Sequence, residues 1–172
     1  MPAVSDPFKT LGLPTRFELS SRDVERAYLA RSAGMHPDAG GEGAGQAALN
    51  DAREVLLNTE ARAEALLRAM GGKGKSEDKS LPEGFLMEFM ETREAVESAS
   101  SDEERAKWRV WAVEQRGAYE RAVAALFLRA ESDSAALQSV RCHLNAWRYI
   151  ERMIEQLDPS HDPNQADFKG SL

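Results

Sequence analysis

Apolar side chains recur at helical spacing along most of the chain, so that each group would share one face of a helix. Runs in which apolar and polar residues alternate, the pattern typical of a half-buried strand, are missing. The pattern therefore predicts an all-α protein. We expect seven helices, near residues 7–11, 21–35, 46–57, 60–70, 82–98, 101–130 and 133–157.

Residues that favour helix ends bracket several of these segments. Asp6 precedes the first segment and Gly12 follows it, as expected of an N-cap and a C-terminal glycine. The pair Gly71-Gly72 ends the fourth segment in the same way. The second and sixth segments open with a capping box, Ser20-x-x-Asp23 and Ser101-x-x-Glu104.

A polar stretch divides the chain into two parts. Residues 71–80 contain no apolar side chain and are rich in glycine and lysine, which is typical of a linker. We therefore expect an N-terminal helical domain over residues 1–72, a linker over 73–80, and a C-terminal domain over 81–158. The three long helices of the second domain have short connections, which predicts an antiparallel three-helix bundle. Residues 159–172 are polar and contain proline, so we expect a disordered tail.

The tripeptide His36-Pro37-Asp38 lies between a helical segment and a glycine-rich stretch. Pro37 has no amide donor and disfavours the α region for the residue before it, so the helix must end close by. Helix, HPD, loop and helix is the organisation of a J-domain, in which a helical hairpin carries the HPD motif. The alternative is a chance turn, since proline and aspartate are common turn residues. The position at a helix end favours the J-domain.

Composition and charge narrow the classes of function. The net charge of −7 argues against nucleic-acid binding, which depends on basic surfaces. The single cysteine, Cys142, excludes a disulfide framework and a cysteine-based zinc site, and it favours a reducing, cytoplasmic setting. No apolar run is long enough to span a membrane, and the first residues resemble no targeting segment. Neither a complete P-loop nor histidines with metal-ligand spacing are present, so we expect no catalytic site, metal or cofactor.

The helix expected at 82–98 carries more apolar surface than one buried face requires. At 100° per residue, one narrow sector contains Phe85, Phe89, Thr92 and Val96, which suffices for packing. Arg93 is the only basic residue between Glu83 and Glu104, so the helix is also acidic. Such a stretch is either a solvated face or a docking surface for a basic partner. The residues on the remaining faces are Leu86, Met87, Met90, Glu91 and Glu94.

Five segments carry a resemblance to a known family: 6–14 (DPFKTLGLP), 36–38 with 49–52 (HPD and LNDA), 62–67 (RAEALL), 85–94 (FLMEFMETRE) and 147–152 (WRYIER). Together they resemble the HscB family, the J-protein co-chaperones of iron–sulfur cluster assembly. The segment 85–94 is the most specific, because J-proteins in general lack it.

The resemblance implies a co-chaperone that stimulates the ATPase of a DnaK/HscA-class chaperone and delivers to it an IscU-class iron–sulfur scaffold protein. It implies chaperone binding by His36, Pro37, Asp38, Arg22, Arg26 and Arg31. It implies scaffold binding by Leu86, Met87, Met90, Glu91, Glu94 and Tyr149.

Two other functions remain open from the sequence. One is a J-protein adaptor for a different client, which the segment 85–94 disfavours. The other is a helical interaction module with a vestigial HPD, because Asp23 and Glu25 interrupt the basic residues of the helix before it.

Overall fold

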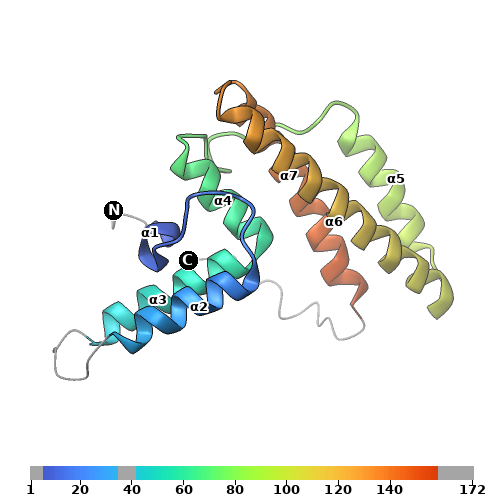
Figure 1. The fold of residues 1–172 in the computed structure, drawn as a ribbon. Helices are drawn as coiled ribbons and strands as arrows, with labels where there is room; N and C mark the ends of the chain where they lie inside the picture. The colour runs from blue at the N-terminus through green and yellow to red at the C-terminus, as the bar shows by residue number, and fades with distance from the viewer. Residues whose placement is uncertain (1–5, 35–41, 159–172) are drawn as a thin grey trace. The chain divides into compact units, whose positions relative to one another are not determined.

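The computed structural model describes residues 6–34 and 42–158. These residues form helices and connecting turns without any strand, so the expected all-α class is confirmed (Figure 1). None of the helices in this part of the chain is long and apolar enough to cross a membrane. The helices are α1 (Pro7–Leu11), α2 (Ser21–Ala33), α3 (Glu42–Leu57), α4 (Thr59–Ala69), α5 (Phe85–Glu97), α6 (Asp102–Ala130) and α7 (Ala136–Leu157).

The expected caps of α1 and the expected capping box at the start of α6 form. Asp6 Oδ1 accepts a hydrogen bond from the Phe8 amide at 3.0 Å, and Gly12 ends α1 with a left-handed φ of 65°. The Ser101 hydroxyl accepts from the Glu104 amide at 3.1 Å, while the Glu104 carboxylate accepts from the Ser101 amide at 3.2 Å. This reciprocal pair is the capping box that the sequence indicates.

Two helix starts differ from the expected positions. Helix α5 begins at Phe85 rather than at residue 82, because Gly84 has a φ of 76° and the Phe85 amide donates to the Pro82 carbonyl in a turn. Helix α3 begins at Glu42, four residues before the expected start, and includes Gly45. Glycine lowers helix propensity by only about 1 kcal/mol, so it does not forbid a helix that gains packing elsewhere.

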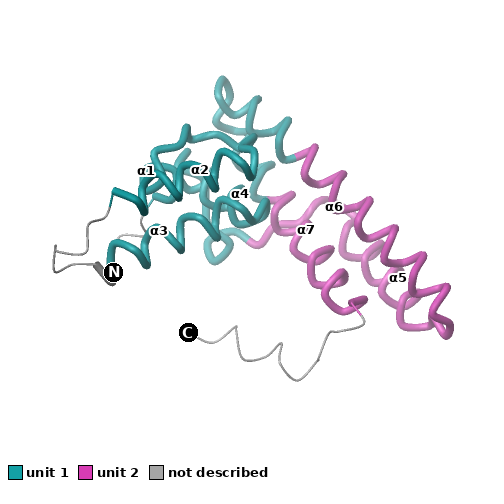
Figure 2. The backbone as a smooth tube through the Cα atoms, turned by 60° about the horizontal axis from the view of Figure 1, so that its bottom comes forward, with its two compact units in different colours: residues 1–78, 123–141 teal, residues 79–122, 142–172 magenta. Residues whose placement is uncertain are grey.

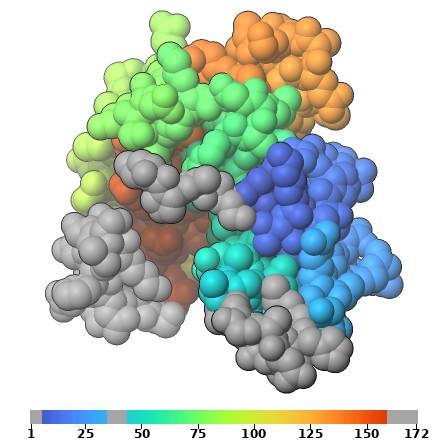
Figure 3. Space-filling view, turned by 90° about the vertical axis from the view of Figure 1, so that its left-hand side faces the viewer, coloured from blue at the N-terminus to red at the C-terminus, as the bar shows by residue number. Residues whose placement is uncertain are grey.

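The chain forms two compact units, shown in separate colours in Figure 2. Unit 1 comprises residues 1–78 and 123–141, and unit 2 comprises residues 79–122 and 142–172. In unit 1, helices α1, α2 and α3 pack together, and their surfaces adjoin in Figure 3. The buried side chains that they contribute are Phe8, Leu11, Val24, Leu49, Ala52 and Leu56.

Residues 123–141, which end α6 and begin α7, complete the core of unit 1. The Phe17 and Phe127 rings lie 5.7 Å apart, and Arg141 donates two hydrogen bonds of 2.7 Å to the Glu64 carboxylate. The sequence pattern places residues 123–141 in the expected C-terminal domain, whereas in the structure they belong to unit 1. A boundary of independent folding at residues 73–80 remains a prediction.

In unit 2, α5 and the remaining parts of α6 and α7 form a three-helix arrangement. Its buried centre is Ala112, Met153 and Leu157, against which Phe89, Val96, Trp108, Trp111 and Ile154 pack. Arg109 donates to the Leu157 carbonyl at 3.3 Å, whereas Arg116, about two turns later, donates to Glu151, which precedes Leu157. As residue numbers rise along α6, the numbers of the partner residues in α7 fall. The two helices are therefore antiparallel, as expected.

Candidate functional site

Helix α5 buries one narrow side and exposes the rest. Its partly or fully buried side chains are Phe85, Phe89, Thr92 and Val96, so the expected inner sector is confirmed. The Phe85 ring lies 5.7 Å from Phe89 and 6.4 Å from Tyr119 of α6, edge to face in the second case. These contacts fix the rotation of α5 about its own axis and therefore decide which residues face outward.

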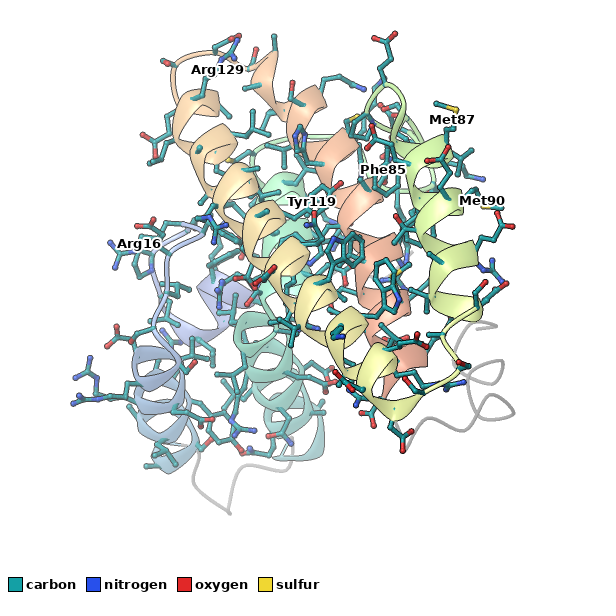
Figure 4. The ribbon with its side chains drawn as sticks, turned by 90° about the vertical axis from the view of Figure 1, so that its right-hand side faces the viewer. Arg16, Phe85, Met87, Met90, Tyr119 and Arg129 are labelled. Carbon is teal, nitrogen blue, oxygen red and sulfur yellow. The ribbon has the colours of Figure 1, made fainter. Side chains whose placement is uncertain are left out.

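The outward side of α5 carries three long apolar side chains. Leu86, Met87 and Met90 are 51%, 67% and 53% exposed. In Figure 4 Met87 and Met90 point away from the bundle, whereas Phe85 points into it. We call Leu86, Met87, Met90, Glu91 and Glu94 the α5 ridge. Exposed leucine and methionine clustered on one helix face are typical of protein-binding surfaces.

The α5 ridge is also negatively charged. Glu91 and Glu94 are exposed and form no ion pair with any residue that the structure describes. The neighbouring cation, Arg93, donates to Glu97 at 2.8 Å within the same helix, so its charge is already compensated. An open hollow of about 630 Å³ lies along this side, lined by Met87, Met90, Glu91, Arg93, Glu94 and Glu97. A basic segment with apolar side chains fits this combination.

Tyr149 lies on the inner side of α5 and not on the α5 ridge. Its ring is half-buried and packs edge to face on Phe89 at 5.1 Å and on Phe85 at 5.6 Å. In this arrangement Tyr149 supports the two phenylalanines that orient α5. Its direct participation in binding remains a prediction.

The expected chaperone-binding residues fall only partly within the described structure. His36, Pro37 and Asp38 lie outside the described residues. Arg22 and Arg26 are exposed on one side of α2, one turn apart, and Arg26 pairs with Asp23.

Arg31 occupies a different side of α2. A Cβ placed on Gly12 would lie 2.1 Å from Arg31 Nη2, so the guanidinium rests on the end of α1. The three arginines therefore do not form one continuous basic face. Leu29, which the sequence pattern did not single out, is 62% exposed and shares the side of Arg22 and Arg26. Its spacing of three residues from Arg26 is the signal that could have identified it.

Polar contacts join α2 to α3, the helices on either side of residues 35–41. Arg53 donates to both Glu25 oxygens, at 2.8 and 2.6 Å, and its guanidinium lies 5.2 Å from the Tyr28 ring centre. The Tyr28 hydroxyl donates to Asn50 at 2.8 Å. The hydrogen bonds from Arg53 hold the pKa of the Glu25 carboxyl below its usual value. These contacts hold the hairpin of α2 and α3 together.

Within residues 6–34 and 42–158, no three His, Cys, Asp or Glu side chains gather closely enough to hold a metal ion. Cys142 is half-buried within α7. The arrangement offers surfaces for partner proteins.

Comparison with known proteins gives consistent matches. Residues 81–158 match a family model described as the HSCB C-terminal oligomerisation domain. The co-chaperone protein HscB homolog of Bordetella avium is 28% identical over 166 residues, which cover 90% of this chain and 96% of that protein. The homolog of Vibrio cholerae is 35% identical over 104 residues, covering 55% of this chain and 61% of that protein.

The same fold occurs in a solved structure. The crystal structure of human co-chaperone protein HscB matches with a TM-score of 0.77 over 91% of this chain and 82% of that chain, at 18% identity. This likeness confirms the expected fold class, a J-domain joined to a helical bundle.

Proposed function

We propose that the chain is an HscB-type co-chaperone that stimulates the ATPase of a DnaK/HscA-class chaperone and delivers to it an IscU-class iron–sulfur scaffold protein. In this function the chain itself carries out no chemical step. It holds two proteins together and raises the activity of one of them.

The α5 ridge is the observation that carries the proposal. Leu86, Met87 and Met90 leave more than half of their side-chain surface exposed, and burial of apolar surface stabilises a complex by about 25 cal/mol per Å² before ordering costs. Methionine side chains adapt to the shape of a partner. Glu91 and Glu94 at the edge of the α5 ridge would attract a basic segment and raise its rate of association.

Chaperone docking is assigned to the HPD tripeptide together with Arg22, Arg26 and Leu29. Two arginines on one side of α2 suit an acidic chaperone surface, and Leu29 beside them supplies apolar contact. Proline fixes its own φ, so a tripeptide centred on Pro37 loses less conformational entropy on docking. Arg31, which rests on the end of α1, would support the position of α2 rather than contact the chaperone.

The first prediction tests the α5 ridge. Replacing Leu86, Met87 and Met90 together by alanine should weaken scaffold binding by about 3 kcal/mol or more, because the three side chains would form the hot spot of the interface. The thermal midpoint should change little, since their surfaces are already largely exposed. Titration calorimetry with an IscU-class scaffold protein and thermal melts measure the two effects.

The matched control is Phe85→Ala on the inner side of the same helix. Phe85 is 9% exposed and touches three aromatic rings, so its loss should cost roughly 3–5 kcal/mol of folding stability. Native scaffold affinity in the triple alanine variant would contradict the proposed role of the α5 ridge. A native chain that stimulates the chaperone but binds no IscU-class scaffold protein would serve a different client.

The second prediction concerns the HPD tripeptide. His36→Gln or Asp38→Asn should abolish stimulation of the chaperone ATPase and leave scaffold binding and the thermal midpoint nearly unchanged, because the two tasks use different helices. Asp102→Asn, at the exposed start of α6, is the control and should stimulate normally. Full stimulation by either HPD variant would refute the chaperone-activating function. Steady-state ATP hydrolysis with and without the co-chaperone is the measurement.

A further inference from the structure

The methionines in the described part of the chain differ sharply in their access to water. Met87 and Met90 on α5 are 67% and 53% exposed, whereas Met153 of α7 is 3% exposed in the buried centre of unit 2. Met70, at the end of α4, is half-buried. The two most accessible thioethers in this part of the chain therefore lie on the α5 ridge, one helical turn apart.

Both exposed methionines are open to small molecules in water. They point away from the bundle in Figure 4 and line the open hollow of about 630 Å³ along α5. A thioether is polarisable, and a peroxide oxidises it to a sulfoxide where solvent reaches the side chain. Leu86 beside them supplies apolar surface without an oxidisable atom, and burial in the core protects Met153 from the same reaction.

Oxidation would change the chemistry of the α5 ridge and leave the position of α5 intact. A sulfoxide is polar, and burying its oxygen against an apolar partner surface leaves that oxygen without a hydrogen-bond donor, which weakens the contact. The carboxylates of Glu91 and Glu94 beside it accept hydrogen bonds and donate none. The ring contacts of Phe85 and Phe89, which fix the rotation of α5, involve neither exposed methionine.

We propose that Met87 and Met90 form a reversible oxidation switch that weakens binding of the scaffold protein to the α5 ridge. This inference rests on the function proposed above and adds its regulation. Hydrogen peroxide transfers one oxygen atom to each thioether: the O–O bond breaks, an S–O bond forms, sulfur loses two electrons, and the peroxide is reduced to water. A thiol-dependent methionine sulfoxide reductase reverses the step, because two thiols become a disulfide and the sulfoxide oxygen leaves as water.

Peptide mass mapping of the full chain tests the modification site without any partner protein. During limited treatment with hydrogen peroxide, Met87 and Met90 should gain oxygen about tenfold faster than Met153, because solvent reaches only the first two freely. The thermal midpoint of the protein oxidised at these two positions should stay near that of the untreated protein, since both side chains lie outside the core. Oxidation of Met153 at the same rate would overturn the selectivity on which the switch depends.

Titration calorimetry with an IscU-class scaffold protein tests the switch itself, after catalase has removed the peroxide so that only the co-chaperone is oxidised. Oxidation should raise the Kd about tenfold or more, and repair with dithiothreitol and both epimer-specific methionine sulfoxide reductases should return it to within about threefold of the untreated value. Native affinity after complete oxidation of Met87 and Met90 would refute the switch alone. Absence of binding by the untreated chain would refute the function proposed above, and the switch with it.

Two variants locate the sensitive sulfur atoms. Met87→Leu with Met90→Leu keeps apolar side chains of similar size and leaves no sulfur on the α5 ridge, so peroxide should not change its affinity, whatever its affinity before treatment. Cys142→Ala is the matched control: it removes the single cysteine, which is half-buried in α7, and should still lose affinity on oxidation as the native chain does. A leucine variant that loses affinity on oxidation, or a Cys142→Ala variant that keeps it, would place the sensitive sulfur elsewhere and overturn the proposal. Oxidation and repair of the native chain need no substitution, so they decide the question even where a variant binds poorly.

Discussion

At the scale of single residues, Tyr119 joins the aromatic cluster of unit 2 to ionisable neighbours. Its ring lies edge to face with Phe85 at 6.4 Å and 6.3 Å from the His143 ring. Burial raises the pKa of the Tyr119 phenol, and the nearby charges of Glu88 and Cys142 raise it further. The folded protein therefore binds the phenolic proton more tightly than the unfolded chain does.

Tyr119 should make stability fall at alkaline pH. Below its unfolded pKa of about 10 the phenol is neutral in both states, and its contribution is fully present. As pH rises through the higher folded pKa, the unfolded chain ionises first and the contribution is lost. Tyr119→Phe should therefore show a shallower loss of stability above pH 10. Urea unfolding across this range measures the slope, and parallel slopes for the two proteins would contradict the assignment.

Residue patterns predicted which face of a helix is buried, but they did not predict which neighbouring element a side chain contacts. Helical periodicity separated Phe85 and Phe89 from Met87 and Met90, because the period of a helix alone decides which side a residue takes. It did not show that Tyr149 packs beneath Phe89 or that Arg31 rests on Gly12. Those placements depend on which neighbouring element fills the space, and a single sequence contains no direct signal for that.

At the scale of elements, local chemistry decides helix ends only where a cap is present. Asp6 and the capping box of Ser101 with Glu104 were predicted because they act within four residues. The start of α5 was misplaced, since Gly84 takes a left-handed conformation that composition alone does not indicate. The ties between α2 and α3 were not anticipated either, because Glu25 and Arg53 are 28 residues apart.

At the scale of the whole molecule, residues 73–80 resemble a linker in composition but form hydrogen bonds with side chains of α7. Asp78 accepts from Gln138 at 2.5 Å, and the Ser80 carbonyl accepts from Asn145 at 2.8 Å. Residues 1–72 in isolation lack Phe127 and Arg141, which complete the core of unit 1. A fragment of residues 1–72 should therefore be less stable than the same residues in the intact chain.

The Glu64–Arg141 pair tests how strongly residues 123–141 stabilise unit 1. The Arg141 side chain is 2% exposed and that of Glu64 is 25% exposed, so water can solvate the carboxylate but not the guanidinium. Glu64→Leu leaves a buried cation without this carboxylate and should cost about 3–5 kcal/mol of folding stability. Arg141→Met leaves a carboxylate that water can reach, so its cost should be clearly smaller.

The double variant Glu64→Leu with Arg141→Met distinguishes a charge effect from a packing effect. Removing both charges leaves an apolar contact of similar volume, and a buried ion pair replaced in this way often costs almost nothing. We therefore expect the double variant to be more stable than Glu64→Leu alone, with a large coupling energy in urea unfolding. Additive losses would mean that the two side chains contribute through separate contacts. Residues 123–141 would then join unit 1 through apolar packing such as that of Phe17 with Phe127, and not through this ion pair.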